Sequence, residues 1–164
     1  MPRSQSALIK ALNGKVAKKP PVWLMRQAGR YLKEYRTVRK PQTDFIKFCL
    51  DSEQAARVTV QPIERYGFDA AILFSDILMI PWALNRNVKF ETGIGPVLDP
   101  MDKPSDVIEK DFPFFEEKLL PIGNTIKITK NLLPKNVALI GFAGAPWTII
   151  TYMAEGGSSR DFLK

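Results

Sequence analysis

The chain has 164 residues, of which 45% are hydrophobic and 25% charged, an ordinary balance for one globular domain with a sizeable core. Its formal net charge is +7, which permits an anionic partner, but the basic residues are scattered and argue against a dedicated nucleic-acid surface. One cysteine and no histidine exclude an internal disulfide and a zinc site built from cysteine and histidine. This composition fits a reducing, cytoplasmic setting.

The first part of the chain is predicted to be mostly helical. SALIKALNGK has helical spacing and a glycine stop, which predicts a helix ending near Asn13–Gly14. AKKPP predicts an extended linker, because each proline disfavours helix in the residue before it. Residues 25–40, MRQAGRYLKEYRTVRK, fit either a helix or a loop flanked by helix. Asp51 or Ser52 is the expected cap of another helix, which we expect to bend or break near Pro62.

The middle of the chain contains the first predicted strand. Phe68–Phe74, FDAAILF, is a short apolar run closed by polar residues, which predicts a buried parallel strand. Asn87–Glu91 is a weaker strand candidate, and Gly93–Pro100 is expected to be loop. Phe114–Leu133 has helical periodicity that we expect Pro121 to interrupt.

The last part of the chain predicts a second buried strand followed by a helix. Val137–Phe142 is the strand, and Ala145–Glu155 is the helix, with a proline near its first turn. Val137–Ala154 lacks charge over nearly the length of a membrane span, but two glycines and a proline interrupt it, so we expect no span. The N-terminus shows no secretory signal.

Strand, helical stretch, strand and helix in this order predict a parallel α/β architecture. Ser158–Phe162 has the pattern of a helix cap and first turn, and the sequence stops there. We therefore expect residues 1–164 to be the N-terminal portion of a single domain that is truncated at its C-terminus.

Two arginines in PVWLMRQAGRYLKEYR are the first candidate binding group. Arg26 and Arg30 are four residues apart, and on a helix they would face the same way. Guanidinium groups bind carboxylates bidentately, and Trp23 and Met25 would supply apolar surface beside them. The alternative is a pair of surface arginines whose stems cover Trp23.

Asp76 and Tyr152 are the next candidates. Asp76 follows the predicted strand in AILFSD, at the edge where open α/β sheets and barrels bind ligands. There it could stabilise a developing cation, or simply cap a helix starting at Ile77. Tyr152 could donate a hydrogen bond into a pocket, although a buried tyrosine can be purely structural. The glycines of GFAGAPW fit no dinucleotide or P-loop pattern and are expected to allow close packing or to leave room for a flat ligand.

Four segments of the chain together resemble the uroporphyrinogen decarboxylase family: PVWLMRQAGRYLKEYR, FDAAILFSDILMIPWAL, GIGP and LIGFAGAPWTIITYMAEGGSS. The resemblance covers most of residues 20–160. It implies a (β/α)8 TIM barrel, of which this chain would form an N-terminal partial barrel. It also implies a substrate with eight carboxylates on a cyclic tetrapyrrole, uroporphyrinogen, whose four acetates lose carbon dioxide without any cofactor.

The resemblance assigns roles residue by residue. Arg26, Gln27 and Arg30 match substrate-binding positions, and Asp76 matches the aspartate that faces the pyrrole N–H groups. Phe142 and Tyr152 match an aromatic packing position and a tyrosine near that aspartate. On this basis Asp76, Arg26 and Tyr152 are the predicted catalytic residues, and no metal is implied.

The resemblance also implies what this chain lacks. The family uses a serine and a histidine from the second half of the barrel, so we expect the chain alone to be catalytically incomplete and poorly stable. Full-length members usually form homodimers. Two other interpretations stay open at this point: a corrinoid-dependent methyltransferase of the same barrel superfamily, and a non-enzymatic basic protein that binds RNA.

Overall fold

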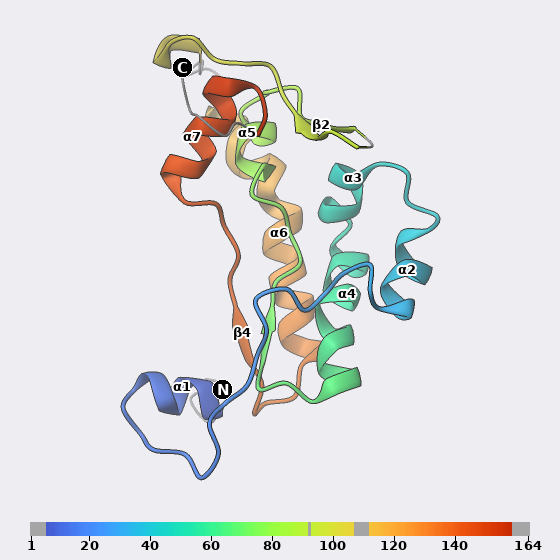
Figure 1. Cartoon of the computed structure of the whole chain (residues 1–164), viewed down its shortest axis with the longest axis vertical. Coiled ribbons are helices and arrows are strands. Elements are labelled where there is room, and N and C mark those ends of the chain that lie inside the picture. The colour runs from blue at the N-terminus through green and yellow to red at the C-terminus, as the bar shows by residue number, and fades with distance from the viewer. Residues whose placement is uncertain (1–5, 92, 107–111, 159–164) are drawn as a thin grey trace. The chain divides into compact units, whose positions relative to one another are not determined.

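The computed structural model describes residues 6–91, 93–106 and 112–158, excluding the side chains of residues 112 and 113. The chain forms two compact units, whose elements are labelled in Figure 1. The first unit comprises Met1–Phe74 and Ile122–Phe142, and the second comprises Ser75–Pro121 and Ala143–Lys164. The expectation of a single domain stays a prediction.

A parallel pair of strands lies at the centre of the first unit. Strand β1 (Ala70–Ile72) pairs with β4 (Ala138–Ile140), with Ala70 opposite Ala138 and Ile72 opposite Ile140. Both strands fall inside the predicted apolar runs, and their parallel pairing is confirmed. The chain between parallel neighbours must cross over, and the helix before β4 supplies part of that connection. The architecture is therefore α/β, as the sequence predicts.

Among its described residues, the first unit contains four complete helices: α1 (Ala7–Leu12), α2 (Lys33–Arg39), α3 (Phe45–Leu50) and α4 (Ser52–Tyr66). Helix α1 ends before Asn13 and Gly14, as expected, and Gly14 has a positive φ of 73°. The sequence did not predict α3, although Asp44 caps it by accepting a hydrogen bond from the backbone N–H of Lys47.

Helix α4 was expected to bend or break near Pro62, and the structure shows that it does not break there. Asp51 caps its start, as predicted, by accepting a hydrogen bond from the N–H of Gln54 at 3.1 Å. The helix then runs through Pro62 to Tyr66 and ends at Gly67, which has a left-handed φ of 66°. A proline removes one N–H donor, and the buried face of α4 against β1 compensates for that loss.

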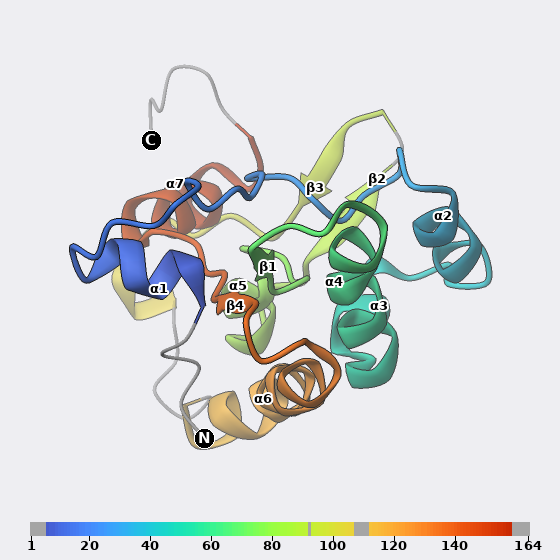
Figure 2. The same cartoon turned by 90° about the horizontal axis from the view of Figure 1, so that it is seen from below.

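The long helix α6 (Phe112–Leu132) likewise continues through Pro121, so the predicted interruption there is wrong. Its residues up to Pro121 belong to the second unit and the rest to the first. In the first unit α4 and α6 lie next to the β1–β4 pair, as Figure 2 shows from below. Val60 and Ile63 of α4, Ala71 of β1, and Leu133 and Val137 form one buried apolar cluster there.

A second cluster joins the other helices of the first unit to the end of β1. Tyr35 of α2 and Phe48 of α3 both contact Phe74 edge-to-face, with ring centroids 5.8 and 5.1 Å away. Leu32 and Val58 complete the buried set. Helix α2 is thereby fixed against the residue that follows strand β1 by two positions.

The second unit contains α5 (Met79–Ala83), β2 (Lys89–Glu91), β3 (Gly95–Val97), a 3₁₀ helix (Pro104–Asp106) and α7 (Pro146–Glu155). Strand β2 confirms the weaker strand candidate, and it pairs antiparallel with β3. The segment Gly93–Pro100 was expected to be loop, so β3 corrects that expectation in part. The hairpin that pairs the two strands supplies the hydrogen bonds that the local sequence did not reveal.

Helix α7 confirms the prediction of a strand, a turn and a helix for the uncharged C-terminal segment. It begins at Pro146, where the missing N–H costs nothing, and ends at Glu155, with Gly156 as the cap residue. Within the described residues, no helix is both long and apolar enough to cross a membrane. The helix predicted to start near Ser158–Phe162 falls on residues 159–164, outside the described residues.

Candidate functional site

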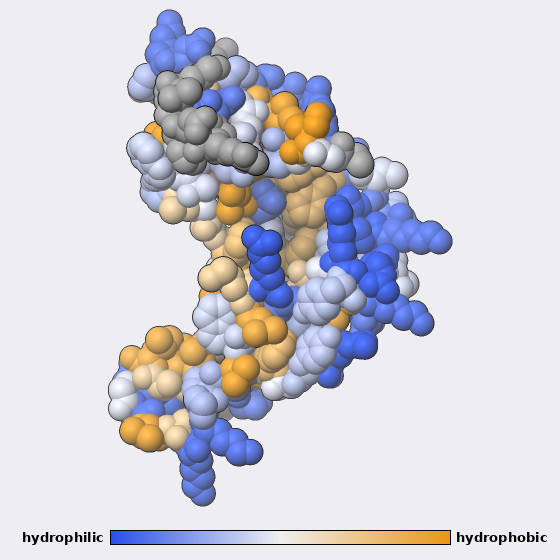
Figure 3. Space-filling model, viewed as in Figure 1, coloured by the Kyte–Doolittle hydropathy of each residue, from blue (hydrophilic) through white to orange (hydrophobic). Residues whose placement is uncertain are grey.

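The structure places Arg26 and Arg30 in a loop, which confirms the expected alternative of a loop flanked by helix over one continuous helix. Both lie in an irregular loop that precedes α2, not on a helix. Both arginines are exposed, and the segment before them exposes apolar side chains, with Leu24 50% and Met25 80% accessible. On the face drawn in Figure 3, hydrophobic and strongly hydrophilic side chains lie next to one another. Cations next to apolar surface suit an anion that has an apolar body.

Gln27 anchors this loop to strand β1. Its side chain is only 3% exposed, and its Nε2 donates a hydrogen bond to the carbonyl of Ala70 at 3.0 Å. Its Oε1 accepts a hydrogen bond from the N–H of Leu24 at 2.8 Å. The resemblance made Gln27 a substrate-binding residue. In the structure, both polar groups of this amide bond to the backbone and hold the loop that carries the two arginines.

The segment before the loop is fixed next to the start of β1. The N–H of Val22 donates to Oδ2 of Asp69 at 2.7 Å, and the N–H of Asp69 donates to the carbonyl of Val22 at 2.9 Å. Sequence reasoning did not single out Asp69. Because its partner is 47 positions away, no local pattern could have revealed this contact.

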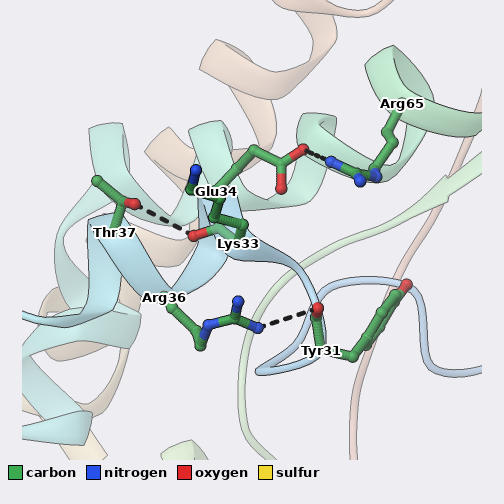
Figure 4. A network of polar contacts seen from close by, with 6 residues as sticks. All are labelled: Tyr31, Lys33, Glu34, Arg36, Thr37 and Arg65. Carbon is green, nitrogen blue, oxygen red and sulfur yellow. Dashed lines mark hydrogen bonds and ion pairs between the residues drawn. The ribbon is translucent and has the colours of Figure 1, made fainter.

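The far end of the loop is held by α2. Arg36 donates from Nη1 to the carbonyls of Arg30 and Tyr31, at 2.8 and 3.1 Å, and Figure 4 shows the bond to Tyr31. The Tyr31 hydroxyl donates to the carbonyl of Gln27. Beside this group, Glu34 pairs with Arg65 of α4. A hydrogen bond from the backbone N–H of Glu34 and the Arg65 guanidinium lower the pKa of the Glu34 carboxyl.

Asp76 lies in the second unit, in the turn between β1 and α5. Its Oδ1 accepts a hydrogen bond from the N–H of Leu78 at 2.8 Å. Helix α5 begins at Met79 with Leu78 as its cap residue, so Asp76 stabilises the turn before the helix rather than acting as its N-cap. Burial raises the pKa of the Asp76 carboxyl, and the Leu78 N–H partly opposes this shift.

Thr59 is a site-supporting residue that the sequence did not reveal. Its hydroxyl, on α4, accepts a hydrogen bond from the N–H of Phe74 at 2.9 Å and donates to the carbonyl of Ala55 at 2.7 Å. Phe74 is the first residue of the FSD sequence, and Asp76 is its last. The end of β1 is therefore held by a side chain of the neighbouring helix.

The other two predicted site residues follow β4. Phe142 lies two positions beyond that strand and is 43% exposed, and Tyr152 is half-buried on α7. Between them, Gly144 packs so closely that an added Cβ would lie 2.4 Å from Cδ1 of Ile149. This contact confirms close packing at Gly144 only, because a Cβ added at Gly141 would meet no atom within 4 Å.

The structure thus gathers the predicted residues in two groups. Arg26, Gln27 and Arg30 share one loop of the first unit. Phe142 belongs to the same unit but not to that loop, and Asp76 and Tyr152 belong to the second unit. Within the second unit, α5 contacts α7. Among the described residues, no three histidine, cysteine or acidic side chains gather in a way that could hold a metal ion.

The parallel strand pair and its helices make this an α/β protein, with two exposed arginines on an anchored loop of the first unit and a partly buried aspartate in the second. The chain belongs to the uroporphyrinogen decarboxylase family, whose profile matches residues 3–164. It is 51% identical over 160 residues to a uroporphyrinogen decarboxylase of Rhodospirillum rubrum, and 52% identical over 158 residues to one of Maricaulis maris.

These matches cover 98% and 96% of this chain but 46% of each relative, so the chain spans about half the length of the curated relatives it matches. The fold is similar to that of a methyltransferase from Methanosarcina mazei, with a TM-score of 0.67 at 18% identity. That likeness covers 91% of this chain and 44% of the methyltransferase. It agrees with part of an α/β barrel.

Proposed function

We propose that this chain supplies the carboxylate-binding part of a uroporphyrinogen decarboxylase. The enzyme would convert the four acetate groups of uroporphyrinogen III to methyl groups and yield coproporphyrinogen III. The observation that carries the proposal is the anchored loop with exposed Arg26 and Arg30 beside exposed Leu24 and Met25. Membership of the family adds support.

The two arginines would bind the carboxylates on the rim of the macrocycle, while the apolar side chains would contact its ring carbons. Arginine suits this task because its guanidinium stays charged and offers paired donors. Gln27, Tyr31 and Arg36 hold the loop backbone, so less conformational freedom would be lost when the ligand binds. Phe142 would pack against the flat ring.

Each decarboxylation needs an electron sink, and the substrate itself would supply it. A proton added to the pyrrole carbon next to the acetate-bearing carbon makes a cationic iminium. The bond between the acetate carboxylate and its methylene then breaks, and its electron pair neutralises the iminium as carbon dioxide leaves. A second proton converts the exocyclic methylene to a methyl group, and loss of the first proton restores the pyrrole. No cofactor is part of this proposal.

Asp76 would stabilise the ring cation and accept hydrogen bonds from pyrrole N–H groups, and Tyr152 would donate a hydrogen bond nearby. A carboxylate in a partly buried position interacts more strongly with such a cation than one in water. Arg26 is assigned to carboxylate binding and orientation, because a guanidinium group holds its proton too tightly to be a good general acid at neutral pH.

The remaining proposals concern the whole enzyme. It would act in the cytoplasm on a small-molecule substrate, without nucleic acid or membrane, and it would form a homodimer. The portion of the family's length that this chain does not span would complete the barrel and the catalytic groups.

The test is the affinity of the chain for uroporphyrin I, the stable oxidised macrocycle with the same eight carboxylates, measured by quenching of tryptophan fluorescence. Arg26→Ala and Arg30→Ala should each weaken binding about tenfold, the size expected for one charged hydrogen bond. Coproporphyrin, with four carboxylates, should bind more weakly. Arg57→Ala is the matched control, because Arg57 is an exposed arginine of α4 in the same unit.

Equal losses in the Arg57 variant would show that the binding is a general charge effect and would refute the assignment. A single-stranded RNA that bound more tightly than uroporphyrin, with affinity insensitive to Arg26 and Arg30, would favour a basic RNA-binding protein instead.

A further inference from the structure

We propose that Arg36 is a positioning residue that holds the carboxylate-binding loop in place through the loop's own backbone. This inference rests on the proposed function for the identity of the ligand, but the contact itself is independent of it. Neither the motif nor the chemistry of carboxylate binding assigns a role to Arg36.

One nitrogen of the Arg36 guanidinium bridges two successive carbonyls of the loop. Nη1 donates to the carbonyl of Arg30 at 2.8 Å and to that of Tyr31 at 3.1 Å. Both acceptors are the last loop residues before Leu32, the cap residue of α2. Figure 4 shows the Arg36 side chain reaching back from the helix to the loop. The guanidinium therefore acts on the peptide that carries the Arg30 side chain.

Helix α2, which carries Arg36, is held firmly in place. Its own N–H donates to the carbonyl of Leu32 at 3.1 Å, and Leu32 is 1% exposed. The neighbouring Tyr35 is 5% exposed and packs edge-to-face on Phe48 and Phe74. Helix α2 thus has a fixed position in the first unit, and Arg36 transmits that position to the loop.

The loop is held at its other end by Gln27, whose amide joins it to β1. Between the two anchors, the Tyr31 hydroxyl donates to the carbonyl of Gln27 and closes the loop on itself. Three side chains thereby determine where residues 26–31 lie, while the side chains of Arg26 and Arg30 stay exposed. Removing Arg36 would release the Arg30 end only.

The competing role for Arg36 is direct binding of a ligand carboxylate, and two substitutions separate the roles. Arg36→Lys keeps the positive charge but loses the planar guanidinium, and Arg36→Met keeps most of the stem and loses the charge. Lys33→Met is the matched control, because it removes one positive charge from an exposed position on the same helix.

The first measurement is uroporphyrin I affinity at several salt concentrations. If Arg36 positions the loop, Arg36→Lys and Arg36→Met should both weaken binding by about five- to tenfold. The salt dependence of Arg36→Lys should then match wild type, and that of Arg36→Met should match the Lys33→Met control, which loses the same charge. If Arg36 binds the ligand by its charge, Arg36→Lys should keep nearly full affinity. Arg36→Met alone should then show a reduced salt dependence, and this result would overturn the proposal.

The second measurement needs no ligand. Amide hydrogen exchange of residues 29–32 should be about fivefold faster in Arg36→Met than in the wild-type chain, because local opening of the loop costs less. The amide of Leu73, which donates to the carbonyl of Ile140, should be unchanged in the same sample and shows that the fold is intact. Lys33→Met should leave both regions unchanged.

Loop exchange equal to wild type in Arg36→Met would refute the positioning role, whatever the ligand result. If the wild-type chain does not bind uroporphyrin, the proposed function fails. The exchange measurement then decides the role of Arg36 by itself.

Discussion

Gln27 offers the sharpest test of the loop geometry, because one buried amide makes two hydrogen bonds to backbone groups. Gln27→Met keeps the length of the side chain and removes both bonds. The carbonyl of Ala70, a fully buried residue, then lacks its donor, at a cost of about 1–3 kcal/mol. The N–H of Leu24 adds less than about 1 kcal/mol, since Leu24 is half exposed and water can replace the bond. We expect a total loss of about 2–3 kcal/mol in the free energy of unfolding.

Gln27→Glu adds a pH signature to this prediction. At neutral pH the new carboxylate would face the Ala70 carbonyl in a buried position, so the variant should lose more stability than Gln27→Met. When protonated, the carboxyl can donate to Ala70 and still accept from Leu24. Burial raises the pKa of the introduced carboxyl in the folded state, so the folded protein binds the proton more tightly than the unfolded chain. The deficit should therefore shrink as the pH falls through that raised pKa.

The assay is urea unfolding followed by tryptophan fluorescence and circular dichroism at pH 5 and pH 8, each variant compared with wild type at the same pH. Gln61→Met is the matched control: Gln61 is 4% exposed on α4, and among the described residues its Oε1 has no hydrogen-bond partner. It should cost less than Gln27→Met. A Gln27→Met loss below about 0.5 kcal/mol, or a Gln27→Glu deficit that grows as the pH falls, would refute the anchoring role.

Two further predictions concern the second unit. Burial raises the pKa of Asp76, so the folded state holds that proton more tightly and stability falls as the pH rises from the ordinary aspartate range through the raised pKa. Asp76→Asn keeps Oδ1 for the Leu78 N–H and should remove this dependence; a clear loss of stability at pH 8 in urea unfolding would contradict it. Gly144→Ala should destabilise by about 1–3 kcal/mol, because its Cβ would lie 2.4 Å from Cδ1 of Ile149. Ile149→Val lacks Cδ1 and should recover part of that loss in a double-mutant cycle; simple additivity would show that the clash is not the cause.

The parts of the fold that the sequence predicts are those set by local pattern. Two apolar runs predicted the parallel strands, and a proline and a glycine indicated the bounds of α7. The errors at Pro62 and Pro121 arise where tertiary packing overrides a local preference, because the helix on each side is buried or long enough to continue. Strand β3 was missed because its pairing with β2 is not visible in its own residues.

In the candidate site, too, local pattern and long-range contacts decide different features. The sequence allowed a helix or a loop flanked by helix for residues 25–40, and local pattern could not decide between them; the binding role of Arg26 and Arg30 stays a prediction. The loop conformation depends on side-chain bonds to backbone groups far along the chain, of which the bond from Gln27 to Ala70 spans 43 positions. Asp69 and Arg36 lie inside the segments FDAAILFSDILMIPWAL and PVWLMRQAGRYLKEYR, but neither residue type nor spacing indicated their contacts with backbone groups.

The hydroxyl of Thr59 joins a helix and a strand through one oxygen atom. Its two bonds use the donor and an acceptor of the group, and the side chain is 1% exposed, so water has no access with which to replace either bond. The position of the end of β1 therefore depends on helix α4 through this side chain. A protein engineer who transplanted the FSD turn into another scaffold would have to carry the threonine-bearing helix with it, or redesign a donor–acceptor pair to take its place.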